Sequence, residues 1–249
     1  MNEKIIKKYS SLAFKKYREK YGLFLAEGHH LIDELLKSHW EPEHLITSNG
    51  ETFRKLNSIK KAANLELVKP AIIEKIATTK TPQEILGIVK IPRISTTNLT
   101  ACRRIIIADR IKDPGNMGTI IRTARAFGFD AVITTPSSVD IFNPKVIRAT
   151  QGAMFGIRLF FDIKIKEIGE NLRPTHTFYS LDPRGNIDID DIYPDDRHVL
   201  MVGSEIEGVS ESLSSIVHYK IRIPHTDSVN SLNAAVAAGI AMHRFSATY

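Results

Sequence analysis

The stretch "DPGNMGTIIRTARAFG", residues 113–128, places two polar side chains near the start of a predicted helix. Asn116 and Arg122 follow a Pro-Gly turn there, and the free N–H groups of a helix start favour an anion. Arg122, one to two turns further along, could reach the same anion. The stretch is neither G-x-G-x-x-G nor G-x-x-x-x-G-K-[ST], so it lacks the fingerprints of dinucleotide binding and of the P-loop. A plain strand-to-helix connection with a surface arginine is the alternative interpretation.

Two further stretches carry polar residues beside glycine or small residues. In "MVGSEIEGVS", residues 201–210, Gly203 and Gly208 bracket Glu205, and glycine allows a close backbone approach or a positive φ. In "IPHTDSVNSLNAAVAAGIA", residues 223–241, Ser231 and Asn233 precede a helix that is rich in alanine. Ser231 or Asn230 would suit its N-cap, and the small side chains would allow close packing against another backbone.

The elements around these stretches indicate an α/β fold in which each polar set follows a strand. Apolar and β-branched runs predict strands, 3.6-residue spacing predicts helices, and their alternation is typical of a mostly parallel sheet. Ligands of such folds bind at the carboxyl edge of the sheet, where the three polar sets would meet. We expect strands at 103–109, 130–135, 157–161, 176–181, 198–203 and 220–224, and helices at 117–127, 144–154 and 231–245.

The first part of the chain predicts a smaller α/β unit. The polar segment 93–101 predicts a linker, so we expect one domain over 1–95 and a second over 96–249. In the first domain we expect one or two basic helices at 4–20, strands at 22–28, 44–48, 65–69 and 84–92, and helices at 29–38, 51–64 and 70–79.

The positive charge of the chain is unevenly distributed. Residues 1–95 hold 17 Lys and Arg against 11 Asp and Glu, whereas residues 96–249 hold 17 of each, and the net charge is +6. All of the excess lies in the first domain, which suggests a polyanion partner, most plausibly nucleic acid, while a merely solvated surface is an equally acceptable interpretation of the charge alone.

Composition argues against several other classes. Cys102 is the single cysteine, so no internal disulfide can form and a thiolate metal cluster is not expected. His29 and His30 adjoin each other on a predicted helix and would point apart, which is poor metal geometry. We find no secretory signal and no apolar run long enough to span a membrane, and we expect a cytoplasmic protein without a bound metal.

The three polar stretches, in this order, closely resemble the motifs of the SpoU-type (TrmH) RNA 2′-O-ribose methyltransferases of the SPOUT superfamily. The resemblance covers roughly residues 103–245 and includes "NPKVIRATQGAMF", which is similar to the second helix of that family. "KYGLFLAEGHHLIDELL" is similar to the start of the family's substrate-binding domain, a small α/β fold. Two positions depart from the usual pattern, Ile206 where a small residue is more common and His225 where methionine is common.

The resemblance implies a catalytic domain with a deep trefoil knot, S-adenosylmethionine as the cofactor, an RNA substrate, and a homodimer whose active sites combine residues of both chains. The backbones of Gly203, Ile223 and Leu232 match the positions that hold the cofactor. The polar active-site set is matched by Asn116, Arg122, Glu205, Ser231 and Asn233.

The expected reaction is methyl transfer to a ribose 2′-hydroxyl, in ribosomal RNA rather than transfer RNA. In the family the counterpart of Arg122 is the proposed base, but a guanidinium resists deprotonation, so Arg122 could instead clamp the substrate phosphate. Glu205 could shape the cofactor loop or pair with an arginine. Alternatives to the expected reaction are 2′-O-methylation of transfer RNA, methylation of a base, and an RNA-binding or ribosome-assembly protein without activity.

Overall fold

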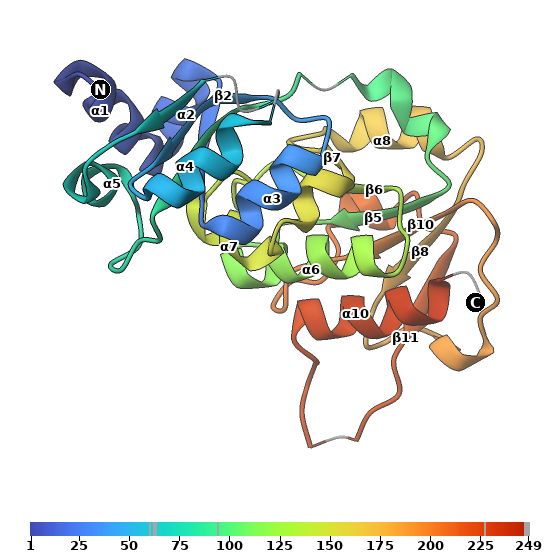
Figure 1. Ribbon diagram of the computed structural model, residues 1–249. Coiled ribbons are helices and arrows are strands. Elements are labelled where there is room, and N and C mark those ends of the chain that lie inside the picture. The colour runs from blue at the N-terminus through green and yellow to red at the C-terminus, as the bar shows by residue number, and fades with distance from the viewer. Residues whose placement is uncertain (60, 62–63, 94, 227, 247–249) are drawn as a thin grey trace. The chain divides into compact units, whose positions relative to one another are not determined.

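The protein consists of two compact units. The structure is a computed structural model that describes residues 1–59, 61, 64–93, 95–226 and 228–246 (Figure 1). The first unit comprises the described part of residues 1–93 together with residues 140–156, and the second comprises the described part of 94–139 and 157–249. The chain therefore leaves the second unit once, after residue 139, to complete the first unit.

The first unit is built on a four-stranded sheet with strand order β1-β4-β2-β3. β4 runs antiparallel to β1 and to β2, and β2 runs parallel to β3. Its strands are β1 (Leu23–Glu27), β2 (Pro42–Thr47), β3 (Leu65–Leu67) and β4 (Ile85–Lys90). Its helices are α1 (Glu3–Ser10), η1 (Ser11–Ala13), α2 (Lys15–Tyr21), α3 (His29–Lys37), α4 (Gly50–Asn57), α5 (Pro70–Ile76), α7 (Pro144–Thr150) and η4 (Ala153–Gly156).

Helix α3 shows how apolar spacing fixes an element in this unit. Leu31, Ile32 and Leu35 are buried and Leu36 is half-buried, as the sequence spacing predicted. The predicted helix at 51–64 is shorter in the structure, because α4 ends at Asn57. Residues 60, 62 and 63 of that prediction lie outside the described residues.

Residues 140–156 belong to the first unit through a buried ion pair and an aromatic cluster. The guanidinium of Arg18, 2% exposed, donates to Asp140 at 3.0 Å through Nε and also hydrogen-bonds main-chain carbonyls of η1. The ring of Phe24 on β1 lies 5.1 Å from that of Phe142 and 6.4 Å from that of Phe155, measured between centroids. This apolar contact holds α7 and η4 against β1.

The second unit is a seven-stranded, all-parallel sheet with strand order β7-β6-β5-β10-β8-β11-β9. Its strands are β5 (Arg104–Ala108), β6 (Ala131–Thr134), β7 (Arg158–Phe160), β8 (Thr177–Leu181), β9 (Ile187–Asp188), β10 (His198–Val202) and β11 (Tyr219–Arg222). Its helices are η3 (Thr96–Ala101), α6 (Pro114–Ala126), α8 (Ile165–Leu172), η5 (Ile189–Asp191), α9 (Glu211–Ser214) and α10 (Ala234–Phe245). This confirms the α/β fold class with a parallel sheet. Because all strands are parallel, the loops that follow β5, β10 and β11 meet at one edge.

Helix α6 begins at Pro114, three residues before the predicted start at Met117, with a capped N-terminus and the apolar face that the spacing predicted. The side chain of Asp113 accepts a hydrogen bond from the N–H of Asn116 at 2.8 Å, and Pro114 occupies the first turn, where its missing N–H costs nothing. Met117 and Ile120 are among the residues of its fully buried face. Gly128 follows the helix with φ +69°, the left-handed conformation that commonly ends helices.

Helix α10 lies side by side with α6 (Figure 1), and its small residues allow this close contact. Ala235 and Ala238 are buried, and a Cβ on Gly239 would already be in van der Waals contact with Thr123 of α6, at 3.8 Å. The predicted N-cap was wrong, because Asn233 rather than Ser231 or Asn230 caps α10.

Several short elements were not predicted. α9 has four residues and β9 two, which is too short for periodicity to indicate them. The expected linker at 93–101 instead contains η3, and its Leu99 is fully buried in the core of the second unit.

Candidate functional site

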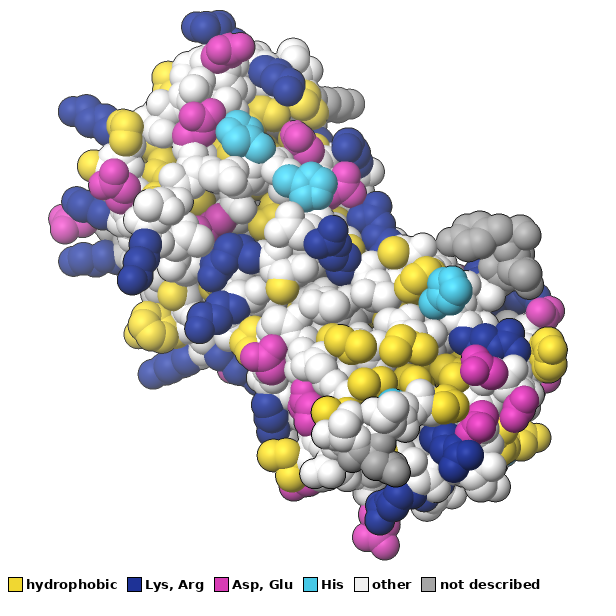
Figure 2. Space-filling model, turned by 90° about the horizontal axis from the view of Figure 1, so that it is seen from below, with side chains coloured by type: hydrophobic (Ala, Val, Ile, Leu, Met, Phe, Trp, Pro, Cys, Tyr) yellow, Lys and Arg dark blue, Asp and Glu magenta, His cyan; other side chains and the backbone are white. Residues whose placement is uncertain are grey.

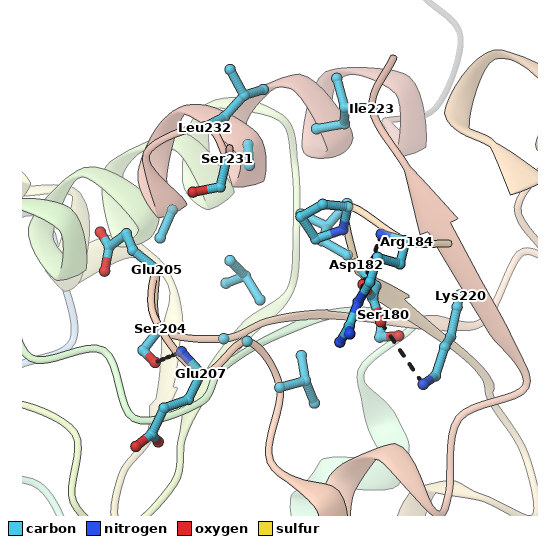
Figure 3. Close-up of a pocket in the computed structure, with 18 of the residues that line it drawn as sticks. Ser180, Asp182, Arg184, Ser204, Glu205, Glu207, Lys220, Ile223, Ser231 and Leu232 are labelled. Carbon is cyan, nitrogen blue, oxygen red and sulfur yellow. Dashed lines mark hydrogen bonds and ion pairs between the residues drawn. The ribbon is translucent and has the colours of Figure 1, made fainter. Parts of the chain in front are cut away.

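A pocket of about 570 Å³ lies at the carboxyl edge of the second sheet (Figure 3). Its walls come from residues 180–184 after β8, residues 202–209 after β10, and residues 220–237 around β11 and the start of α10. This volume is typical of sites for small molecules and cofactors. The residues predicted at the site that line it are Gly203, Glu205, Ile223, Ser231 and Leu232.

The loop after β10 forms one wall and requires glycine at its start. A Cβ on Gly203 would lie 2.0 Å from the carbonyl carbon of Gly208, so no larger residue fits without moving main chain. Gly208 has φ +63° and donates its N–H to the carbonyl of Ser204 at 2.9 Å. The loop therefore folds back on itself and brings Gly203 against its own far end.

A buried carboxylate holds the far end of this loop. Asp109, which follows β5, is 1% exposed. One of its oxygens accepts a hydrogen bond from the Ser210 N–H at 2.7 Å, and the other accepts from the Thr135 hydroxyl at 2.6 Å. Asp109 thereby joins the ends of β5, β6 and β10, which is consistent with the need of a buried carboxylate for hydrogen-bond partners.

The next residue, Arg110, contacts the same loop from outside. Its guanidinium forms an ion pair with Glu207 and donates to the Gly208 carbonyl at 3.3 Å. Arg110 has φ +54°, a conformation that residues other than glycine rarely adopt. The strained backbone turns this side chain onto the pocket loop, so the segment after β5 positions the wall that contains Gly203.

Three polar side chains, from the first turn of α6, the loop after β10 and the N-cap of α10, form a continuous hydrogen-bond chain beside the pocket. The Asn233 side-chain oxygen accepts from the N–H groups of Ala235 and Val236, at 3.0 and 3.2 Å, as the N-cap of α10. Its amide nitrogen therefore points outward and donates to the Asn116 oxygen at 3.0 Å. The amide nitrogen of Asn116 in turn donates to Oε1 of Glu205. The cap thus fixes the orientation of both amides and of the carboxylate.

The structure brings four of the five predicted polar residues together and leaves Arg122 apart. Asn116, Asn233 and Glu205 are linked directly, and Ser231 points into the same side of the pocket as Glu205 (Figure 3). Arg122 is exposed on α6, does not line the pocket, and forms no hydrogen bond or ion pair with another residue that the structure describes.

The opposite end of the pocket is charged, and its residues were not predicted. Asp182, after β8, forms ion pairs with Lys220 at 3.8 Å and with Arg184 at 3.8 Å (Figure 3). A Cβ on Gly185 would lie 2.8 Å from the carbonyl carbon of Ile221, so the turn "DPRG" packs directly on β11. That turn at a strand end was the available signal, but it carries no recognisable motif.

The two residues that depart from the family pattern both line the pocket. Ile206 is 95% exposed at the tip of the loop after β10, and an apolar residue so exposed contributes nothing to the core. His225 donates a hydrogen bond from Nδ1 to the carbonyl of Ile223 at 2.8 Å, because a carbonyl oxygen can only accept. Neither residue displaces a polar group of the site.

Within the described ranges, no cluster of three or more His, Cys, Asp or Glu side chains is arranged to hold a metal ion. None of the helices in the same ranges is both long enough and apolar enough to cross a bilayer.

Comparison with known proteins agrees with the fold. The sequence profile of the SpoU rRNA methylase family matches residues 103–243, and that of the MRM3-like substrate-binding domain matches residues 2–87. The 23S rRNA (guanosine(2553)-2′-O)-methyltransferase RlmP of Bacillus subtilis is 30% identical over 242 residues, which cover 97% of this chain and 95% of that protein.

Two solved structures are similar over nearly the whole chain. A protein of Porphyromonas gingivalis described as a putative RNA methyltransferase of the TrmH family superposes with a TM-score of 0.87 at 26% identity, covering 99% of this chain and 98% of that one. An rRNA methyltransferase of Sinorhizobium meliloti, solved with AdoMet bound, superposes with a TM-score of 0.86 at 27% identity, covering 97% and 94%.

The protein belongs to the SpoU rRNA methylase family. This confirms the family that the three motifs predicted and the methyltransferase class of enzyme. The match over residues 2–87 likewise confirms a substrate-binding domain in the N-terminal part of the chain.

Proposed function

We propose that the protein transfers the methyl group of S-adenosylmethionine to a ribose 2′-hydroxyl of ribosomal RNA. The observation that carries this proposal is the hydrogen-bond chain from Asn233 through Asn116 to Glu205 at the rim of the pocket. It presents an oriented carboxylate beside a cavity of cofactor size. Family membership supports the same reaction, as does the 2′-O-methyltransferase activity for which the B. subtilis relative is named.

The pocket suits S-adenosylmethionine, which supplies an electrophilic methyl carbon on its sulfonium sulfur. The backbones of Gly203, Ile223 and Leu232 would hold the cofactor, because a glycine that a Cβ cannot replace permits a ligand to approach main chain. Asp182 and Lys220 place both signs of charge at one end of the pocket, which suits a ligand with an ammonium and a carboxylate group.

Glu205 is the proton acceptor in this proposal. Its Oε1 is occupied by the Asn116 amide, while its Oε2 makes no hydrogen bond with a described residue and is free to take the hydroxyl proton. A carboxylate has acceptor sites only, whereas the guanidinium of Arg122 has none. Methyl transfer makes the hydroxyl strongly acidic, so an oriented carboxylate is a sufficient base. Ser231, on the same side of the pocket, orients the ribose.

Arg122 clamps an RNA phosphate, and we propose that it serves the pocket of a second copy in a homodimer. In one chain Arg122 is not joined to the polar set. It lies on α6, beside α10, whose Val236 and Ile240 are 52% and 41% exposed on one face. Figure 2, drawn from the side of α10, shows hydrophobic side chains gathered on this surface. Exposed apolar residues of this kind support an interface between copies.

The domain roles follow from the same reasoning. We propose residues 1–95 as the RNA substrate-binding domain and residues 96–249 as the catalytic domain, although 140–156 pack with the first unit. A deep trefoil knot belongs to this proposal. Its support is that α10 packs on α6 and β10, whereas the preceding strand β11 is separated from β10 by β8. A ribosomal RNA substrate makes the cytoplasm the proposed location.

The reaction is tested by incubating the protein with methyl-labelled S-adenosylmethionine and total RNA. Nuclease digestion and mass spectrometry of the nucleosides should give a 2′-O-methylnucleoside from ribosomal RNA. A methylated base, or label in transfer RNA only, would contradict the proposal.

The role of Glu205 is tested with the isosteric variant Glu205→Gln, against Glu211→Gln as a matched control on exposed α9. We expect Glu205→Gln to lose about 10²- to 10⁴-fold in kcat, the usual contribution of a general base, with cofactor affinity retained. Full activity of Glu205→Gln would refute the assignment.

The dimer proposal makes a separate, quantitative prediction by mixing two inactive variants, Arg122→Ala and Glu205→Gln. If Arg122 serves the partner's pocket, half of the randomly formed dimers contain one intact site, and activity recovers to about a quarter of wild type. If Arg122 serves its own chain, every site carries a lesion and no activity returns.

A further inference from the structure

Helices α1 and α2 carry lysine ammonium groups over the rings of two stacked tyrosines. The Lys8 and Lys20 ammonium groups lie 5.2 and 5.5 Å from the ring centroid of Tyr21, and that of Lys16 lies 5.9 Å from the centroid of Tyr17. The rings of Tyr17 and Tyr21 are 15° from parallel, with centroids 6.2 Å apart. These five residues are called the lysine–tyrosine surface below.

The lysines of this surface have no carboxylate partner, unlike the neighbouring Lys7 and Lys15. Lys7 lies 3.9 Å from Glu3, and Lys15 lies 3.7 Å from Glu19, each as an exposed i,i+4 pair. The three lysines of the surface make no ion pair with any carboxylate in the described part of the chain. Their charge is therefore uncompensated.

An exposed aromatic ring stands at the start of α2. Phe14 is the residue before the helix and is 66% exposed. Its ring stacks on no other aromatic ring of the described residues, so neither core packing nor an internal stack explains a phenylalanine there. A large exposed aromatic residue beside uncompensated lysines is typical of surfaces that bind nucleic acid.

We propose that the lysine–tyrosine surface and Phe14 bind unpaired nucleotides of the RNA substrate. The lysines neutralise phosphates and Phe14 stacks on exposed bases, while the half-buried rings of Tyr17 and Tyr21 hold the lysine ammonium groups in place. Unpaired RNA is the preferred occupant because bases inside a duplex are stacked on one another and present no free face to a side chain. The inference rests on the proposed function, since it requires an RNA substrate.

The charge part is tested by the salt dependence of RNA binding, measured by fluorescence anisotropy on the full chain with a labelled oligouridine. The triple variant Lys8→Gln/Lys16→Gln/Lys20→Gln should lower the slope of log K against log salt by about 2, at roughly 0.7 per phosphate on single strands. The control is Lys37→Gln/Lys55→Gln/Lys69→Gln, which removes the same charge elsewhere on the first unit and should leave the slope unchanged. An unchanged slope in the first triple variant overturns the proposal.

The stacking part is tested with Phe14→Leu and Phe14→Trp. Leucine keeps the apolar character but loses the ring face, so oligouridine binding should weaken about 5- to 100-fold, and tryptophan should restore it. Leu67→Ala, which removes another exposed apolar side chain of the first unit, serves as the control. Equal weakening towards a duplex RNA probe, or no rescue by tryptophan, contradicts stacking on unpaired bases.

Methylation assays separate this inference from the proposed function. If the surface is correct, the lysine triple variant raises KM for ribosomal RNA while kcat and the affinity for S-adenosylmethionine stay unchanged. If the wild-type protein methylates no ribose, the proposed function fails whatever the binding data show. If the wild type is active and the triple variant keeps its KM, only the surface is wrong.

Discussion

Asn233 combines two tasks, and substitution can separate them. Its oxygen caps α10 by accepting from the N–H groups of Ala235 and Val236, while its nitrogen donates to Asn116. Aspartate is as good an N-cap as asparagine but offers acceptors only, so Asn233→Asp keeps the cap and removes the donor. Alanine at this position removes both.

The two variants should therefore differ in stability and agree in activity. The free energy of unfolding of Asn233→Asp is expected to lie within about 0.5 kcal/mol of the wild-type value. That of Asn233→Ala should be lower by about 1 kcal/mol, the usual cost of losing an N-cap. In Asn233→Asp the Asn116 amide must turn its nitrogen towards the new carboxylate. Its oxygen then faces Glu205, two acceptors oppose each other, and Glu205 loses its orientation.

A hydrogen bond to a charged group contributes about 1.5–3 kcal/mol, so both variants should lose about 10- to 100-fold in kcat/KM. Urea unfolding gives the stability, and transfer of a labelled methyl group to ribosomal RNA gives the activity. Calorimetric titration with S-adenosylmethionine should show unchanged affinity. If Asn233→Asp is fully active while Asn233→Ala is not, the cap alone matters and the role of the hydrogen-bond chain is refuted.

Three further predictions concern the loop, the first unit and pH. Gly203→Ala should weaken S-adenosylmethionine binding by about tenfold or more in a calorimetric titration, because its Cβ would overlap main chain; unchanged affinity would show that the loop is loose. Arg18→Leu, which leaves the Asp140 carboxylate without its buried partner, should lower the free energy of unfolding by about 3 kcal/mol in urea, and a loss below 1 kcal/mol would contradict this. Burial holds the pKa of His198 below its ordinary value of 6.5, so the unfolded chain takes up the proton first as pH falls. The contribution of His198 to the free energy of unfolding is therefore complete above its pKa in the unfolded chain and declines below that pH, by at most about 1.4 kcal/mol per pH unit. His198→Gln should make this decline shallower when the free energy of unfolding is measured at several pH values.

Much of the second unit could be predicted because its signals are local and strong. Ile105, Ile106 and Ile107 form an apolar β-branched run, and all three are fully buried in β5. The start of α6 was predicted too late, at Met117, because "DPGN" was interpreted as a turn, whereas Asp113 caps the helix and Pro114 is its first residue. The start of α10 was misplaced because Asn230, Ser231 and Asn233 are all acceptable caps, and only the bond from Asn233 to Asn116 distinguishes them.

The part of the site that could be predicted is the part whose position follows from the parallel sheet. Parallel strands bring their carboxyl ends to one edge, so the loops with Asn116, Glu205 and Asn233 had to meet. The separation of Arg122 depends on rotation along α6, where six residues place it about 240° around the axis from Asn116. The charged pair of Asp182 and Lys220 was missed because it joins two strands whose order in the sheet the sequence does not state.

The assignment of residues 140–156 to the first unit could not be predicted from the sequence. They lie between two neighbouring strands, β6 and β7, and α7 follows β6 like any crossover helix of the second unit. Their membership of the first unit depends on Phe24 and Trp40, whose rings meet those of Phe142 and Phe155. Contacts over such a sequence separation leave no trace in local periodicity.

Residues 140–156 lie between two strands of the second unit but pack in the first unit, and this placement sets an order of events during synthesis. The ribosome completes β1 to β4 early, but the Arg18–Asp140 pair cannot form before residue 140 has emerged, and the aromatic cluster is not complete before Phe155 has emerged. By then β5, α6 and β6 have already been made. Phe24 and Trp40 of the N-terminal unit therefore remain uncovered until residues 140–156, which follow the first strands of the second unit, have been synthesised. Chain growth and folding of the two units are thereby interleaved rather than sequential.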